Sequence, residues 1–266
     1  SPPSKSKRRS SFSTTVGYTP EYLRQSADVM CNVAGALWRL AAARSNQYLI
    51  TESGGIVPLV GLLAKGNQGA QEAAAGALWW LATDPKICDA ISKENAIKPL
   101  AALIRNNAPA KEQAALCLSV LATASTDNQG EIARELVHMM STGTPSQLEC
   151  ASQVARDLAL ETGGNHALDE AGAIPFLVQQ IGQGTDQASE NSARALAQVA
   201  CVSDNCRSTI THQLISVRHA ATSIAPDLKV AARAARALKS MNAEEDEHSA
   251  QAVGMAILLF RIHTRD

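Results

Sequence analysis

The 266-residue sequence predicts an all-α protein built from stacked helical repeats. The phrase Ala34-Gly-Ala-Leu-Trp-Arg-Leu-Ala41 returns 41 residues later as Ala75-Gly-Ala-Leu-Trp-Trp-Leu-Ala82. Apolar residues such as Ala74, Leu78 and Leu81 recur three and four positions apart, which is helix periodicity and not the alternation of a strand. The composition is 45% apolar but only 3% aromatic, and it is rich in alanine, the best helix former. These three observations favour closely packed helices.

One recurring segment carries a proline near its start. The first copy is Gly55-Ile-Val-Pro-Leu-Val-Gly-Leu-Leu63. A similar segment recurs 41 residues later as Ala96-Ile-Lys-Pro-Leu-Ala-Ala-Leu-Ile104. Residues Ala173–Ile181 are a looser copy, and Ile132–Met140 are a degraded one without proline. Proline is tolerated in the first turn of a helix, where its missing N–H costs least. We therefore expect a helix to begin at each of these segments.

A second, alanine-rich segment follows each of the first kind and is the predicted long helix of each unit. It covers residues 28–43, 70–83, 111–124, 147–161, 188–202 and 227–241. Helix breakers separate the segments: Asp84-Pro85, Asn106–Pro109, Gly143–Pro145, Gly163–Asn165, Gly182–Gly184 and Ala225-Pro226. Each unit then has a short helix, a proline-started helix and a long helix. Because one unit cannot bury its apolar faces alone, the units must stack.

About six such units are predicted over residues 20–245. The preceding residues 1–19 are basic and rich in Ser and Pro, which predicts a disordered tail. In that tail Arg8-Arg9-Ser10-Ser11 resembles a kinase site centred on Ser11, and Lys5–Arg9 resembles a nuclear-localisation cluster. Residues 246–266 are interpreted as a capping helix or as the opening of a truncated further repeat.

Composition and missing motifs limit the function. A net charge of −1 argues against a general nucleic-acid binder. The six cysteines form no C-x-x-C pair and are interpreted as buried apolar side chains of a reducing compartment. The histidines are scattered, without metal-ligand spacing or a nucleophile motif, so we expect no enzyme, metal or cofactor. No signal peptide or apolar run of membrane length is visible, which predicts a cytoplasmic protein, with nuclear or membrane-peripheral placement left open.

The repeated unit resembles the armadillo repeat. Its form Gly-Gly-Ile-Val-Pro-Leu-Val-Gly-Leu-Leu followed by Ala-Ala-Gly-Ala-Leu-Trp-Trp-Leu-Ala is similar to scaffold-type members, in the style of vacuolar-protein-8-like, catenin-like and plant-type repeats. The resemblance implies a right-handed superhelix whose third helices line a concave groove that binds other proteins. HEAT repeats, the alternative at this period, give a similar solenoid.

The resemblance also implies which positions face the groove. In the family's third helix, Ala-Ala-x-Ala-Leu-x-Asn-Leu-Ala, the first x and the Asn lie four apart on the groove face. Carried over, these pairs are Gly35 with Arg39, Gly76 with Trp80, Leu116 with Val120, Gln153 with Asp157, Arg194 with Gln198, and Arg233 with Ala237. The expected site is thus Arg39, Trp80, Leu116, Val120, Gln153, Asp157, Arg194, Gln198 and Arg233. The asparagine ladder and the tryptophan position of importin-α-like members are absent, which argues against a receptor for basic peptides.

The tryptophans divide into two roles in this interpretation. Trp38 and Trp79 follow a core leucine and are predicted to pack between repeats, whereas Trp80 is the candidate interface anchor. The alternative for Trp80 is packing against a flanking helix. Groove arginines would suit carboxylate or phosphate partners, the alternative being a solvated helix face.

The sequence therefore predicts a non-catalytic scaffold that binds an extended or helical segment of a partner protein. Two other functions stay open. One is a nuclear transport adaptor for basic peptides. The other is the substrate-recruiting region of a larger enzyme, such as a U-box ubiquitin ligase.

Overall fold

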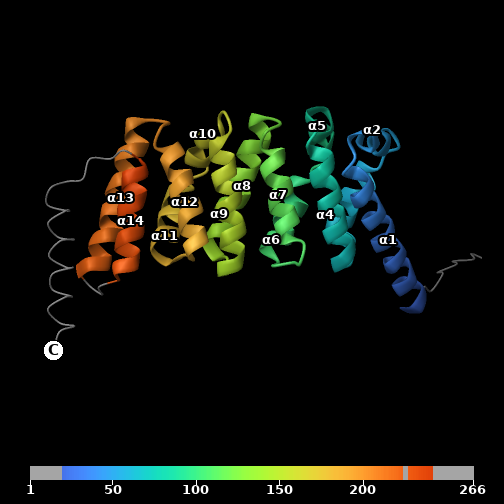
Figure 1. Ribbon diagram of the computed structural model, residues 1–266, viewed down its shortest axis with the longest axis horizontal. Helices are drawn as coiled ribbons and strands as arrows, with labels where there is room; N and C mark the ends of the chain where they lie inside the picture. Colours follow the sequence, from blue (N-terminus) through green and yellow to red (C-terminus); the bar gives the residue numbers. More distant parts are fainter. Residues whose placement is uncertain (1–19, 224–226, 242–266) are drawn as a thin grey trace, which may run out of the picture.

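A computed structural model describes residues 20–223 and 227–241 of the chain. Figure 1 shows the helices standing side by side in one long row, with α1 at one end and α14 at the other. Every regular element in the described residues is an α-helix, which confirms the predicted fold class. The predicted tail with Ser11 and the predicted capping segment 246–266 lie outside these residues.

The described part of the chain holds fourteen helices. They are α1 (Pro20–Ala41), α2 (Arg44–Glu52), α3 (Ile56–Lys65), α4 (Gln68–Ala82), α5 (Pro85–Lys93), α6 (Ile97–Arg105), α7 (Lys111–Leu121), α8 (Thr126–Thr142), α9 (Pro145–Leu160), α10 (Gly164–Glu170), α11 (Ile174–Gln183), α12 (Asp186–Val199), α13 (Asp204–Ser223) and α14 (Leu228–Ser240). All six alanine-rich segments form helices: α1, α4, α7, α9, α12 and α14. The predicted proline segments begin α3, α6 and α11.

The expectation of three helices in every unit is correct for three units and wrong for the units of α8 with α9 and of α13 with α14, while the described residues contain only the long helix α1 of the first unit. Three units contain a short helix that ends in a left-handed residue, at Gly54 (φ 76°), Asn95 (φ 57°) and Gly172 (φ 73°). Glycine and asparagine adopt this conformation more readily than other residues. In α8 and α13 the corresponding helices run on without such a break, and Gly130 lies inside α8. The first two helices of these units are therefore fused.

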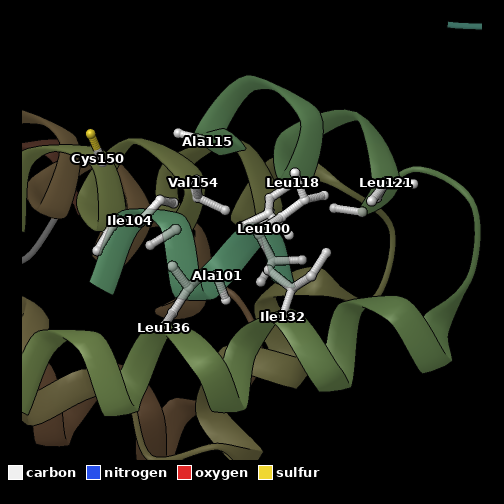
Figure 2. Packing of buried hydrophobic residues seen from close by; sticks show 14 of the residues in the cluster. Leu100, Ala101, Ile104, Ala115, Leu118, Leu121, Ile132, Leu136, Cys150 and Val154 are labelled. Carbon is white, nitrogen blue, oxygen red and sulfur yellow. The ribbon is translucent and has the colours of Figure 1, made fainter. Parts of the chain in front are cut away.

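The core is a continuous layer of aliphatic side chains between the helices. Figure 2 shows part of it, where side chains of α6, α7, α8 and α9 converge. Leu100, Leu118, Leu121, Ile132 and Leu136 are all almost completely buried here. Burying one such side chain contributes about 1.5–3 kcal/mol. This packing of successive units on each other holds the row together.

Buried side-chain amides tie the ends of neighbouring helices. The amide of Gln47 donates to the carbonyl of Ala41, at 2.9 Å, and to that of Trp80, at 3.0 Å. In the same way Asn128 donates to the carbonyl of Leu121, at 2.9 Å. The last carbonyls of a helix have no partner within the helix, so these amides satisfy groups that burial would otherwise leave unpaired.

Four of the six cysteines are buried as predicted: Cys88, Cys117, Cys150 and Cys206. The prediction is wrong for Cys201, which is exposed, and Cys31 is only half-buried. All six thiols are free. Burial raises the pKa of the Cys88 thiol to about 11, so it is protonated and unreactive at neutral pH.

Within the described ranges, no single helix is both long and apolar enough to cross a membrane; only α2 and α3 taken together, bent by 85°, reach that length and composition.

Candidate protein-binding groove

The six alanine-rich helices form one continuous ladder. Each of α1, α4, α7, α9, α12 and α14 packs against the next in this order. The nine residues expected to line a groove all lie on these helices, although they are far apart in the sequence. The ladder is hollowed into a cleft near each end.

The N-terminal cleft lies between α1 and α4 and has a volume of about 580 Å³. It brings together Arg39 and Trp80, two of the predicted groove residues. Arg39 is exposed, and the carboxylate of Glu72 lines the same cleft. The other lining residues are Cys31, Asn32, Gly35, Trp38, Ala42, Gly69 and Ala73. The cleft is therefore lined by two indole rings, by one cation (Arg39) and by one anion (Glu72).

The tryptophans are arranged differently from the expectation in one respect. Trp38 packs between repeats as predicted, because its indole lies against Gly76 of α4. Gly76 is consequently buried, so the expectation that it faces the groove beside Trp80 is wrong. Trp79 and Trp80 are both half-buried, with ring centroids 4.8 Å apart. Trp38 and Trp80 thus line the cleft together.

The middle of the ladder is less open. Leu116 and Val120 on α7, and Gln153 and Asp157 on α9, are each half-buried. Asp157 accepts hydrogen bonds from Ser119 of α7, at 2.8 Å, and from its neighbour Arg156, at 2.6 Å.

Arg156 carries this network onward to the next helix of the ladder. Its guanidinium also donates to Asn191 of α12, at 3.0 Å. The carboxylate of Asp157 is therefore already paired within the protein, and the network links α7, α9 and α12.

The C-terminal cleft lies between α12 and α14 and also has a volume of about 580 Å³. It contains the predicted residues Arg194 and Arg233, while Gln198 is exposed on the same helix as Arg194. The remaining lining residues are Asp186, Ser189, Glu190, Ala193, Lys229, Arg236 and Ser240. Four basic and two acidic side chains line it, so the cleft is net positive.

Arg233 is the groove residue that differs most from the expected open cation. It is 9% exposed, and its guanidinium pairs with Asp186 and donates to the carbonyl of Gly184, at 3.0 Å. Hydrogen bonds from Lys229 and then Arg233 lower the pKa of Asp186 to about 2. Arg194 pairs with Glu190 one turn away, at 2.6 Å. Much of the positive charge of this cleft is thus paired with carboxylates of the protein itself.

Several cleft residues were missed by the sequence reasoning. Glu72 precedes Gly76 by four residues, and Glu190 precedes Arg194 by four, so each lies one turn further along the same helix face. Both residues would have been predicted if the set of groove positions on each long helix had been extended by one turn toward its N-terminus. In the described residues, no group of three or more His, Cys, Asp or Glu could hold a metal ion.

Comparison with known proteins places one segment of the chain in a described repeat family. Residues 45–83, which cover α2, α3 and α4, match the Armadillo/beta-catenin-like repeat. None of the curated protein sequences matches the chain.

Solved structures share the architecture of the whole described row. An engineered protein is 22% identical with a TM-score of 0.63, over 81% of this chain and 91% of its own. A designed armadillo repeat protein is 18% identical with a TM-score of 0.60, over 82% of this chain and 99% of its own. A third structure, a designed armadillo repeat protein in complex with the peptide (KR)4, is 16% identical with a TM-score of 0.59, over 83% of this chain and 93% of its own.

Proposed function

We propose that this chain, in which residues 45–83 match one armadillo repeat and which shares the fold of designed armadillo repeat proteins, is a non-catalytic scaffold that binds a segment of another protein along the ladder. The observation that carries the proposal is the pair of clefts at the two ends of one continuous helical face. A partner segment that fills both clefts would lie along the whole face.

The dimensions of the ladder set the length of that segment. Neighbouring helices pack 8–10 Å apart, so the clefts between α1 and α4 and between α12 and α14 are separated by roughly 35 Å. An extended chain spans about 3.3 Å per residue. An extended partner segment therefore needs at least about 10 residues to reach both clefts.

The side chains that line the clefts determine the amino-acid composition expected of the partner segment. At the N-terminal cleft, Trp38 and Trp80 offer apolar contact area to an aromatic or aliphatic side chain. At the C-terminal cleft, Arg194 and Arg236 suit a carboxylate, because the lining holds more basic than acidic groups. The proposed partner segment is apolar at one end and acidic at the other.

The alternative function is an adaptor for basic peptides. The structural similarity to a designed protein that was solved with (KR)4 is the observation that raises it. The net positive C-terminal cleft opposes it, because basic side chains would be repelled there. The same experiment separates the two functions.

That experiment is a selection of binding peptides of about 16 residues from a random displayed library, a length that spans both clefts. The selected peptides are then measured against an Arg39→Glu, Arg194→Glu variant. The matched control is Lys65→Glu, Lys93→Glu, which makes the same change of charge at exposed residues outside the ladder. We expect acidic-apolar peptides that bind the groove variant at least about tenfold more weakly and the control unchanged.

Two outcomes would contradict the proposal. If the selected peptides bind the groove variant as tightly as the parent, the ladder is not the binding surface. If the selected peptides are basic, the adaptor function is favoured instead.

A further inference from the structure

The C-terminal cleft holds more positive charge than its own carboxylates neutralise. Its two anions are already paired, Asp186 with Lys229 at 2.8 Å and also with Arg233, and Glu190 with Arg194 at 2.6 Å. Because four basic and two acidic side chains line the cleft, two positive charges are left without a counter-charge. One carboxylate would neutralise only one of them, whereas a phosphate monoester carries a charge of about −1.5 to −2 at neutral pH.

Arg236 of α14 presents an open guanidinium to this cleft. The residue is exposed, and its Nε donates to the carbonyl of Ala232 in the same helix, at 3.4 Å. Neither terminal amino group of this guanidinium has a partner among the described residues. A guanidinium in this state binds two oxygens of one phosphate side by side.

Two buried donors lie in the walls of the same cleft. Ser189 of α12 is only 4% exposed, and its hydroxyl makes no hydrogen bond to any described residue. Arg233 of α14 is 9% exposed, and its Nε is likewise unpartnered. A buried donor without an acceptor is unfavourable, so an anion that brings acceptor oxygens into the cleft is favoured there.

These residues belong to facing sides of two packed helices. Lys229, Arg233 and Arg236 are spaced by four and three positions along α14, which places them on one face of that helix. Helix α12, which carries Ser189 and Arg194, packs directly against α14. The cleft is therefore the last step of the ladder, and one end of a segment that lies along the ladder reaches it.

We propose that the C-terminal cleft binds a phosphorylated side chain of the partner segment. The phosphate accepts hydrogen bonds from Arg236 on one wall and from Ser189 on the other. This inference rests on the proposed function, because it specifies which acidic group that segment places between α12 and α14. The whole chain has a net charge of −1, so it does not attract anions in general, and the preference for phosphate arises in the cleft.

The probes are three synthetic libraries of peptides of about 16 residues, a length that spans both clefts. They differ only in one fixed residue near one end, which is phosphoserine, glutamate or serine. The tightest phosphoserine peptide is then remade with glutamate and with serine at that position, and calorimetry measures all three against the whole chain. We expect the phosphoserine form to bind at least about tenfold more tightly than the glutamate form, because it matches the excess charge of the cleft.

Two variants test the two walls of the cleft. Arg236→Gln and Ser189→Ala should each reduce the preference for phosphoserine over glutamate at least about threefold, because each removes a donor to the phosphate. Both should leave the affinity of the serine peptide unchanged. The matched control is Arg134→Gln, since Arg134 is an exposed arginine on α8, outside the ladder. Circular dichroism confirms that each variant keeps its helices.

Three results would overturn the inference while leaving the proposed scaffold function in place. The first is equal affinity for the phosphoserine and glutamate peptides. The second is a phosphoserine preference that Arg236→Gln and Ser189→Ala do not change. The third is free O-phosphoserine binding as tightly as the peptide, which would make a small phosphorylated molecule the occupant. Failure of all three libraries to bind the parent chain would contradict the proposed function itself, and this inference with it.

Discussion

Gly76 of α4 lies directly against the indole of Trp38 on α1. A Cβ atom added at Gly76 would stand 2.6 Å from Nε1 of Trp38, closer than real side-chain contacts. The neighbouring repeat holds a natural comparison, because Gly35 occupies the same register 41 residues earlier and has no atom within 4 Å of the corresponding point. The absence of a side chain at Gly76 is therefore required by packing, whereas at Gly35 it is not.

This pair of glycines predicts two changes of opposite sign. Gly76→Ala should destabilise the protein by about 1–3 kcal/mol, because the rigid indole must move. Gly35→Ala should stabilise it by about 0.5–1 kcal/mol, because alanine is the better helix former. Urea denaturation followed by circular dichroism measures both. Equal stabilisation by the two changes would show that Trp38 does not hold its position.

A second prediction concerns the hydroxyl of Tyr48 on α2, which donates to the carboxylate of Asp84 at 2.6 Å. Asp84 also caps α5 by accepting from the N–H of Lys86, at 3.0 Å. Tyr48→Phe should lower the melting temperature, because it removes a hydrogen bond to a charged acceptor. In an Asp84→Asn background the same change should cost less. An equal loss in both backgrounds would mean that the hydroxyl does not act through the charge of Asp84.

Thiol labelling should separate the cysteines by burial. At pH 8 we expect a maleimide reagent to modify exposed Cys201 first and half-buried Cys31 more slowly. Cys88, Cys117 and Cys150 should react only on unfolding, because burial protects them and raises the pKa of each thiol. Mass spectrometry of the digested protein identifies the modified residues. Early labelling of Cys117 would show that the core opens locally.

The link between α12 and α14 should make stability depend on acid pH. Lys229 and Arg233 lower the pKa of Asp186 to about 2, so its carboxylate stabilises the folded state above the ordinary carboxyl pKa near 4. That contribution is lost as the pH falls from about 4 to 2. Asp186→Asn should lower stability at neutral pH and flatten this part of the profile. Thermal melts across the acid range, with the exposed acid Asp127→Asn as control, test it.

The ladder could be predicted from the sequence because its signal is periodic. The phrase around Trp38 and its copy around Trp79 fixed the register of α1 and α4, and the alanine-rich segments located the other four helices. The fusion within α8 was not predicted: a helix was expected to begin at Ile132, but this residue lies inside α8, two positions after Gly130. Glycine permits a left-handed turn but does not impose one, so a glycine at this place does not by itself predict a break.

The details of the site depend on contacts that no local pattern reveals. Arg233 was predicted as a groove cation, but its partner Asp186 is 47 residues away in the sequence and belongs to the preceding repeat. Gly76 was expected beside Trp80, but the indole that covers it comes from another unit. Position on a helix face was predictable, whereas the neighbour across the inter-repeat boundary was not.

The hydrogen bonds of the Gln47 side-chain amide affect how the row of helices unfolds. By donating to the carbonyls of both Ala41 and Trp80, it joins the C-terminal ends of α1 and α4 through one buried group. In a linear array, stability is the sum of each unit and its contact with the next, and strong contacts suppress fraying at the ends. Melting of either helix end breaks one of the two hydrogen bonds that this amide makes, and it exposes the group that holds the other. We therefore expect the first two units of this row to unfold together rather than one after the other.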